Sequence, residues 1–338
     1  MTNQKFPFIQ FIQTLSQFRQ TPFVLLDVGC HGGLHPLGQH FAGNLAGFGF
    51  DLEKDEIARL NAAADKPQGA EFYHIKMVGP KDAVEPTDIP SSDIIERSSG
   101  HKACTTLGIF SAQHVKQTAA TKQAVLHEMM LDEFVQQKNL THVDFIKTDT
   151  DGFDFPILKG AQRLLSRTVL GLQVECAING PQSDESNLWR NTDKLLQANG
   201  FSVFDMRVFR YSRAVMPRAF EGHDPAQTEK GQISWCDAFY FRDLGAPDYE
   251  TRTGFIPTPE QILKQAALFE YFGFPDCAAE VLIKYKSQLG TFMNVDGALD
   301  ALTPQDMGKL NYKEYIGVFD HMVKSKQIYP FGRIKLQK

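Results

Sequence analysis

Apolar and polar positions form alternating blocks along residues 22–242, and each block has the length and period of a strand or a helix. Residues 23–28 (FVLLDV) are a short apolar run that ends at a glycine, which is typical of a strand buried on both faces. Comparable runs predict further strands at residues 45–50, 71–77, 143–148, 170–175, 201–211 and 234–241. Because strands that alternate with helices pair in parallel, we expect a doubly wound α/β sheet of seven strands.

Helical patterns separate these strands. Residues 154–166 carry an apolar stripe with the helical period, and we expect Asp154 to cap this helix and Pro156 to occupy its first turn. Two further helices are predicted, at residues 34–42 and 186–199. The polar stretch 213–233 has no helical stripe, so the last two strands are expected to pair as an antiparallel hairpin with a long loop.

No strand pattern follows residue 243. Residues 245–257 (GAPDYETRTGFIP) are typical of a linker. Thr258-Pro259-Glu260-Gln261 is a capping box that opens a helix, and Gly273 ends this helix. Further helices are predicted at 276–289 and 304–325, and one at the amino terminus over 5–18. We therefore divide the chain into an amino-terminal helical segment (1–21), an α/β domain (22–243) and a helical appendage (258–338).

Composition narrows the class of protein. The chain of 338 residues is 42% hydrophobic with a formal net charge of −5, which gives no electrostatic reason to expect nucleic acid or an anionic membrane as a partner. The amino terminus is a poor signal peptide, and no apolar run reaches the length of a membrane span. Five scattered cysteines without a CxxC pair suit a reducing cytoplasm, where we expect the protein: Cys30, Cys104, Cys176, Cys236 and Cys277.

A glycine-rich turn follows the first strand. Residues 26–33 (LDVGCHGG) lead from that strand toward a helix, a place where a ligand can approach the backbone closely. In a dinucleotide-binding turn the second and third glycines would fall at positions 31 and 34, where this chain has His31 and Leu34. NAD and FAD are therefore disfavoured, and the chain has no GxxxxGK[ST] loop for a nucleoside triphosphate.

An acidic residue completes this unit. Asp51 ends the second strand, 22 positions after Gly29, where it can accept hydrogen bonds from ribose hydroxyls. A strand, a DxGxxGG turn, a helix and a second strand ending in an acid form the pattern of S-adenosylmethionine binding. The expected cofactor-binding residues are Asp27, Gly29, His31, Gly32, Gly33 and Asp51.

Residues 130–161 (MLDEFVQQKNLTHVDFIKTDTDGFDFPILKGA) resemble the FkbM family of S-adenosylmethionine-dependent methyltransferases. That family reads V-D-F-I-K-x-D-x-E-G-x-E, followed by a helix with V-L-x-G-A. Here the motif positions are Lys147, Asp149, Asp151, Gly152 and Asp154, with the family's two glutamates replaced by aspartates. The resemblance covers about residues 22–242 and implies a Rossmann-like class I methyltransferase domain there, with S-adenosylmethionine as methyl donor.

The resemblance favours O-methylation of a sugar, a glycan or a secondary metabolite. The expected catalytic residues are Lys147, Asp149 and Asp151, with Asp149 as base or substrate-orienting carboxylate. Asp149 and Glu175 at neighbouring strand ends could also hold magnesium, although no third ligand is evident. Two alternatives stay open, namely a nitrogen or other acceptor atom and a non-catalytic binding or assembly protein on the same fold.

Three segments outside the motifs have candidate roles. Residues 79–101 and 213–233 are long polar stretches of the kind that form lids or substrate loops, and His223 on the second is a candidate mobile base. The helices of residues 258–289 have apolar stripes that need a partner, so the appendage could form a homo-oligomer. We expect it to be dispensable for the cofactor site.

Overall fold

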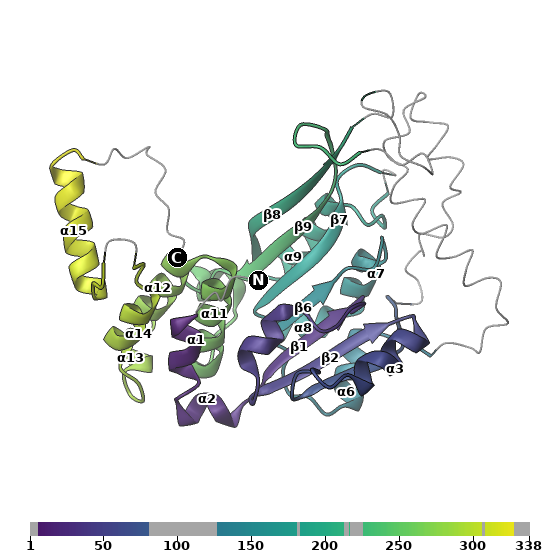
Figure 1. The fold of residues 1–338 in the computed structure, drawn as a ribbon, viewed down its shortest axis with the longest axis horizontal. Helices are drawn as coiled ribbons and strands as arrows, with labels where there is room; N and C mark the ends of the chain where they lie inside the picture. Colours follow the sequence, from purple (N-terminus) through teal and green to yellow (C-terminus); the bar gives the residue numbers. More distant parts are fainter. Residues whose placement is uncertain are drawn as a thin grey trace. The chain divides into compact units, whose positions relative to one another are not determined.

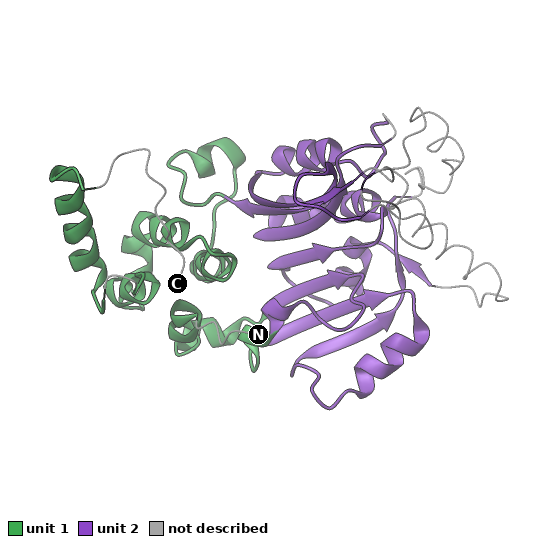
Figure 2. Cartoon of the chain, turned by 45° about the horizontal axis from the view of Figure 1, so that its top comes forward, with its two compact units in different colours: residues 1–23, 39–44, 243–338 green, residues 24–38, 45–242 purple. Residues whose placement is uncertain are grey.

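The computed structural model describes residues 6–80, 127–180, 183–212, 216, 226–305 and 308–327. The chain divides into two compact units (Figure 2). Unit 1 comprises residues 1–23, 39–44 and 243–338, and unit 2 comprises residues 24–38 and 45–242. The two ends of the chain, which the sequence pattern treats as separate segments, thus share one unit. His223 and most of the predicted loops at 79–101 and 213–233 lie outside the described residues.

The centre of unit 2 is a seven-stranded sheet with the order β3-β2-β1-β6-β7-β9-β8 (Figure 1). Parallel pairing joins β2 to β3, β1 to β6 and β6 to β7, whereas β9 runs antiparallel to both β7 and β8. The predicted seven strands and the closing hairpin are therefore confirmed, except that the strand expected over 71–77 is divided into β3 and β4 (Lys76–Met77), which belongs to a second sheet. Their bounds are β1 (Phe23–Val28), β2 (Leu45–Asp51), β3 (Ala70–His74), β6 (Phe145–Thr148), β7 (Gly171–Ala177), β8 (Phe201–Tyr211) and β9 (Gln232–Arg242).

Helices bury one face of this sheet. Leu26, Ile146 and Val174 point into a continuous hydrophobic core, as residues at alternate positions of neighbouring strands must. The helices that supply the other side of this core are α6 (Leu131–Gln137), α7 (Asp154–Lys159), α8 (Gln162–Arg167) and α9 (Trp189–Ala198). Elsewhere in the unit, α3 (Lys54–Ala62) packs on β2 and β3, and a two-stranded sheet joins β4 (Lys76–Met77) to β5 (Glu128–Met129).

Two helix predictions in unit 2 are corrected. The single helix expected over 154–166 is broken into α7 and α8 at Gly160, where a Cβ atom would meet the carbonyl oxygen of Val78 at 2.6 Å. Asp154 does not cap this helix, because Phe153 is the N-cap residue and the Asp154 side chain is buried. The helix expected over 34–42 is a short 3-10 helix, η1 (Pro36–Phe41).

Unit 1 is helical. Its described helices are α1 (Pro7–Ile12), α2 (Ser16–Gln20), α10 (Tyr249–Thr253), α11 (Pro259–Phe272), α12 (Pro275–Lys284), α13 (Lys286–Leu289), α14 (Val295–Leu302) and α15 (Tyr312–Lys324). The capping box at Thr258 and the left-handed Gly273 are present as predicted. The predicted linker is wrong, because it contains α10 with a fully buried Tyr249, and α14 was not predicted.

One buried carboxylate joins the two ends of the chain within unit 1. Glu270 on α11 accepts hydrogen bonds from the backbone N–H groups of Phe8 and Ile9 at 3.0 and 2.9 Å. These N–H groups lie in the first turn of α1, where a helix has no partners of its own, so the negative charge also favours the helix dipole. None of the described helices is long and apolar enough to cross a membrane.

Candidate functional site

The backbone of the glycine turn after β1 adopts conformations that require glycine. Gly29, Gly32 and Gly33 have φ values of 78°, 85° and 131°, which favour glycine. A Cβ atom at Gly29 would lie 1.9 Å from the carbonyl oxygen of Asp149, so only glycine fits between β1 and the end of β6. No atom of the described residues lies within 4 Å of the corresponding position at Gly32, which leaves space beside the turn.

Several backbone N–H groups of the turn already have partners. Those of Gly29 and Cys30 donate to the carbonyl oxygen of Phe50, and that of Gly33 donates to Cys30. The N–H of Gly32 donates to the Glu56 carboxylate at 3.0 Å. Phosphate-binding turns instead direct such N–H groups at the anion. In this turn, by contrast, the N–H groups of Gly29, Cys30, Gly32 and Gly33 have partners within the protein.

A buried ion pair lies beneath the turn. Lys147 Nζ on β6 is 3.1 Å from Asp27 Oδ1 on β1, and both side chains are almost fully buried. The same ammonium group donates to the carbonyl oxygen of Gly29 at 2.7 Å and lies 3.6 Å from Asp149 Oδ2. Burial lowers the pKa of Lys147, but the charges of Asp27 and Asp149 outweigh it, and the pKa is raised. Lys147 is thus a fixed cation that joins three predicted site residues.

His35 extends this network, and the sequence analysis missed it. The backbone N–H of His35 donates to Asp27 Oδ2 at 2.6 Å. Its ring Nδ1 accepts from the N–H of Leu37 at 3.2 Å, so Nε2 carries the proton toward Gln173 Oε1 at 3.1 Å. Burial lowers the pKa of His35, which keeps the ring neutral. No sequence signal distinguishes this histidine from His31, because its partner Gln173 is 138 residues away.

The other predicted residues lie toward solvent. Asp51 is partly buried at the end of β2, and its Oδ1 accepts the N–H of Glu53 at 2.9 Å. His31 is exposed, with Nδ1 3.9 Å from Glu53 Oε2. Asp151 is exposed in a left-handed conformation with φ 53°. Asp51 and His31 therefore share a neighbour, whereas Asp151 lies in the turn that follows β6.

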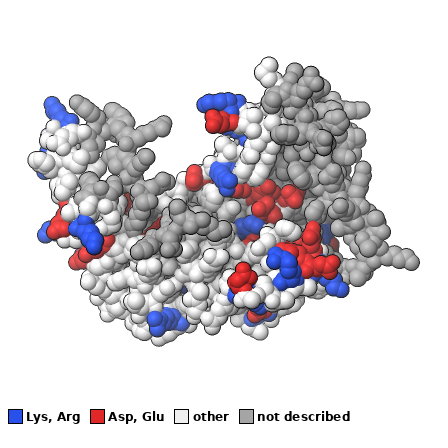
Figure 3. Space-filling view, viewed as in Figure 1, with Lys and Arg blue, Asp and Glu red and all other residues white. Residues whose placement is uncertain are grey.

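Acidic side chains gather where β6, β7 and β9 end or begin (Figure 3). Glu175 on β7 is directly opposite Asp237 on β9, which in turn faces Arg207 on β8. Burial and then the charge of Asp149 raise the pKa of Asp237 to about 6, although Arg207 lowers it. The sequence analysis missed Asp237 and Arg207, because only the register of the antiparallel strands brings them to Glu175.

Two acids of this group are buried, and neither forms an ion pair with a cation of the described residues. Glu175 is 5% exposed and Asp154 is fully buried, and burial is the largest cause that raises the pKa of each. The charge of Asp154 further raises the pKa of Glu175, and the charge of Asp149 further raises the pKa of Asp154, so both carboxyl groups hold a proton more readily than exposed ones would. Within the described ranges, no group of three or more His, Cys, Asp or Glu side chains is arranged to hold a metal ion.

The fold and this site define a class of protein. The strand order, with β9 antiparallel between β7 and β8, is that of a class I methyltransferase with an additional helical unit, as predicted. Residues 53–203 match the methyltransferase FkbM domain, so the resemblance is confirmed and this stretch is a methyltransferase domain of that family. The match begins after the glycine turn and Asp51.

The chain also aligns with solved structures at low sequence identity. Magnesium protoporphyrin IX methyltransferase (ChlM) from Synechocystis PCC 6803 with bound SAM is 11% identical, with a TM-score of 0.28 over 70% of this chain and 80% of that one. A TehB-like SAM-dependent methyltransferase from Corynebacterium glutamicum is 12% identical, with a TM-score of 0.27 over 71% and 90%. The N-terminal domain of EvdMO1 with SAH bound is 8% identical, with a TM-score of 0.28 over 71% and 82%. No curated protein matches the sequence.

Proposed function

We propose that the protein transfers a methyl group from S-adenosylmethionine to a hydroxyl oxygen of a sugar, a glycan or a secondary metabolite. The observation that carries this proposal is the convergence of the glycine turn, Asp51, Lys147 and Asp149 at one edge of a methyltransferase sheet. In open α/β sheets, ligands bind at the carboxyl ends of the strands, which is where these residues lie.

The residues around the turn suit a ligand without phosphates. The side of the turn at Gly32 is open, and Asp51 at the end of β2 offers a carboxylate to ribose hydroxyls. Lys147 holds the carbonyl of Gly29 and neutralises buried Asp27, so it fixes the turn rather than contacting an acceptor. We therefore assign Lys147 to positioning, and Asp27, Gly29, His31, Gly32, Gly33 and Asp51 to the cofactor side.

S-adenosylmethionine, when bound, supplies a methyl carbon that is already electrophilic because it is attached to a sulfonium. The chain must then place an acceptor oxygen in line with that carbon and assist the loss of its proton. Asp149 is half exposed, adjoins Gly29 and faces the ammonium of Lys147, so its carboxylate can orient or deprotonate a hydroxyl. Asp151 follows in the same turn and is exposed, so we assign it to contact with the acceptor.

Asp149→Asn tests the assignment, because the amide keeps the shape of the side chain and removes its charge. We expect the variant to bind S-adenosylhomocysteine as the wild type does and to lose about 100-fold or more in methyl transfer. The assay is transfer of labelled methyl groups to a panel of sugars, glycosides and hydroxylated metabolites. Asp205→Asn, which changes an exposed aspartate of β8, is the matched control and keeps its activity. Near wild-type transfer by Asp149→Asn would show that Asp149 is structural.

A further inference from the structure

An aromatic pair projects from the β8–β9 hairpin beside the acidic group. Phe209 on β8 and Trp235 on β9 are register partners, and their rings stack with centroids 3.6 Å apart and planes inclined by 13°. Both side chains remain partly exposed. The guanidinium of Arg207 lies 5.0 Å from the centre of the Phe209 ring. Because the two rings cover each other and Arg207 lies over the other face of Phe209, the flat apolar surface that remains for a ligand is the outer face of Trp235.

The strand register places this pair beside Asp237 and Arg207, on the face of the sheet that carries Glu175. Trp235 precedes Asp237 by two positions on β9, and Phe209 follows Arg207 by two positions on β8. Side chains two positions apart lie on the same face of a sheet, about 7 Å from each other along the strand. This separation is close to the width of one pyranose ring. A sugar on the outer face of Trp235 would therefore extend a hydroxyl toward Asp237, which lies opposite Glu175 on β7.

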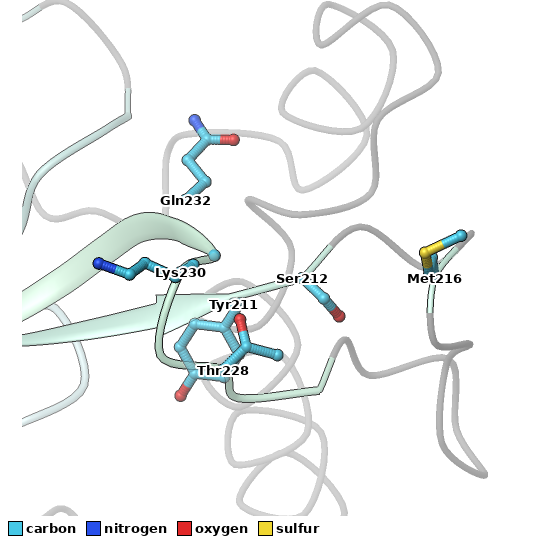
Figure 4. A pocket seen from close by; sticks show the side chains of 7 residues that line it. Tyr211, Ser212, Met216, Thr228, Lys230 and Gln232 are labelled. Carbon is cyan, nitrogen blue, oxygen red and sulfur yellow. The ribbon is translucent and has the colours of Figure 1, made fainter.

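A pocket continues the same surface toward the end of the hairpin (Figure 4). Its volume is about 420 Å³, and most of its lining side chains can donate or accept hydrogen bonds: Tyr211, Ser212, Thr228, Lys230 and Gln232, with Met216. The Trp235 Nε1–H donates to the Tyr211 hydroxyl at 3.3 Å, which connects the aromatic pair to the pocket. Acidic, aromatic and polar groups thus follow one another along the hairpin.

We propose that this surface is a carbohydrate-binding subsite, in which the outer face of Trp235, backed by Phe209, stacks on one pyranose ring and the Tyr211 pocket receives the next unit of a glycan or glycoside. Aromatic faces carry negative charge and attract the C–H groups of a sugar face, whereas hydroxyls at the ring edge need donors and acceptors such as Thr228 and Gln232. The inference rests on the proposed function, because it identifies the acceptor as a carbohydrate and gives its position.

Fluorescence can test this subsite without turnover. The chain has two tryptophans, so Trp189→Phe leaves Trp235 as the sole reporter. We would titrate this protein, with S-adenosylhomocysteine present, with the methyl glycosides of glucose, galactose, mannose and N-acetylglucosamine and with their β1,4-linked disaccharides. We expect a saturable change of Trp235 emission with at least one sugar, and a larger affinity for its disaccharide. If none of the sugars gives a saturable change of emission, the proposal is overturned.

Variants in the Trp189→Phe background locate the binding. Phe209→Leu removes one ring of the stack and should weaken sugar binding about three- to tenfold. Tyr211→Phe removes a single hydroxyl and should reduce the preference for the disaccharide, while Val203→Ala, an exposed residue of the same strand, should have no effect. Unchanged sugar affinity in Phe209→Leu, together with an unchanged preference for the disaccharide in Tyr211→Phe, would contradict this location.

The two proposals fail in different ways. Saturable sugar binding without methyl transfer to any bound sugar would leave the subsite and refute the sugar acceptor. Methyl transfer to another hydroxyl compound, with no sugar bound, would refute the subsite and leave the methyltransferase activity.

Discussion

The buried pair of Lys147 and Asp27 makes a quantitative prediction about stability. Lys147→Met removes the ammonium group 3.1 Å from Asp27 Oδ1 and 2.7 Å from the carbonyl oxygen of Gly29. Asp27 is 1% exposed, and its remaining partner is the backbone N–H of His35. Removing one member of a buried ion pair costs about 3–5 kcal/mol, because it leaves an uncompensated charge. Because Asp27 keeps its hydrogen bond from His35, we expect Lys147→Met to lower the free energy of unfolding by about 3 kcal/mol, near the lower end of that range.

Urea unfolding followed by far-ultraviolet circular dichroism measures this loss. Asp27→Asn in combination with Lys147→Met should recover more than half of it, since the double variant buries no charge. Lys138→Met is the matched control, because its ion pair with Glu71 at 2.9 Å is partly exposed and should be worth less than about 1 kcal/mol. Equal losses in Lys147→Met and Lys138→Met would refute the reasoning.

The sign of the pH dependence provides a second check on the same variant. The pKa of Lys147 is raised in the folded protein by Asp27 and Asp149 against the effect of burial. A basic group with a raised pKa stabilises the fold below its unfolded pKa of about 10.4, and this contribution is lost as the pH rises through the folded value. The difference between wild type and Lys147→Met should therefore be constant near neutral pH and decrease in strongly alkaline solution.

Two further predictions concern Glu270 and Asp237. Glu270→Gln should lower the free energy of unfolding by about 1–2 kcal/mol, because it weakens two buried hydrogen bonds to α1. Calorimetry should show an unchanged affinity for S-adenosylhomocysteine. A large loss of affinity would contradict our expectation that the helical appendage is dispensable for the cofactor site. Burial raises the pKa of Asp237 to about 6, so its ionisation destabilises the fold as the pH rises from about 4 to 6. Asp237→Asn should therefore stabilise the protein at pH 7.5 by about 1 kcal/mol after solvent screening, and it should give no gain at about pH 4. Equal effects in urea unfolding at both pH values would refute the raised pKa of Asp237.

The sheet was predictable because its strands are buried and short. Parallel strands covered on both faces are continuous apolar runs, and residues 23–28 and 143–148 are of this kind. The hairpin was predictable from the polar stretch between its strands. In contrast, β4 and β5 have two residues each, which is too short for any period to appear. The break at Gly160 depends on a close approach to Val78, a contact that the helical stripe of residues 154–166 does not encode.

The candidate site was predictable only where its residues lie within motifs. The glycine turn, Asp51 and the Lys147–Asp149 segment have local spacing, and the structure brings Asp27, Gly29, Lys147 and Asp149 into contact. Asp237 belongs to no motif and reaches Glu175 through strand register, which single-sequence patterns do not fix. Both chain ends likewise belong to unit 1, where one hydrogen bond joins residues 262 positions apart, and no local pattern indicates such a contact.

Isothermal titration of the purified protein with S-adenosylhomocysteine tests the central claim most directly, because it needs no knowledge of the acceptor. We predict micromolar-range binding, no binding of NADH, and an affinity weakened in Asp51→Ala by about 1–3 kcal/mol, the cost of losing hydrogen bonds to a charged group. Glu53→Ala, which changes an exposed neighbour, controls for nonspecific loss of charge. No heat of binding with S-adenosylhomocysteine in the folded wild type would contradict the account, and unchanged affinity in folded Asp51→Ala would remove the ribose assignment.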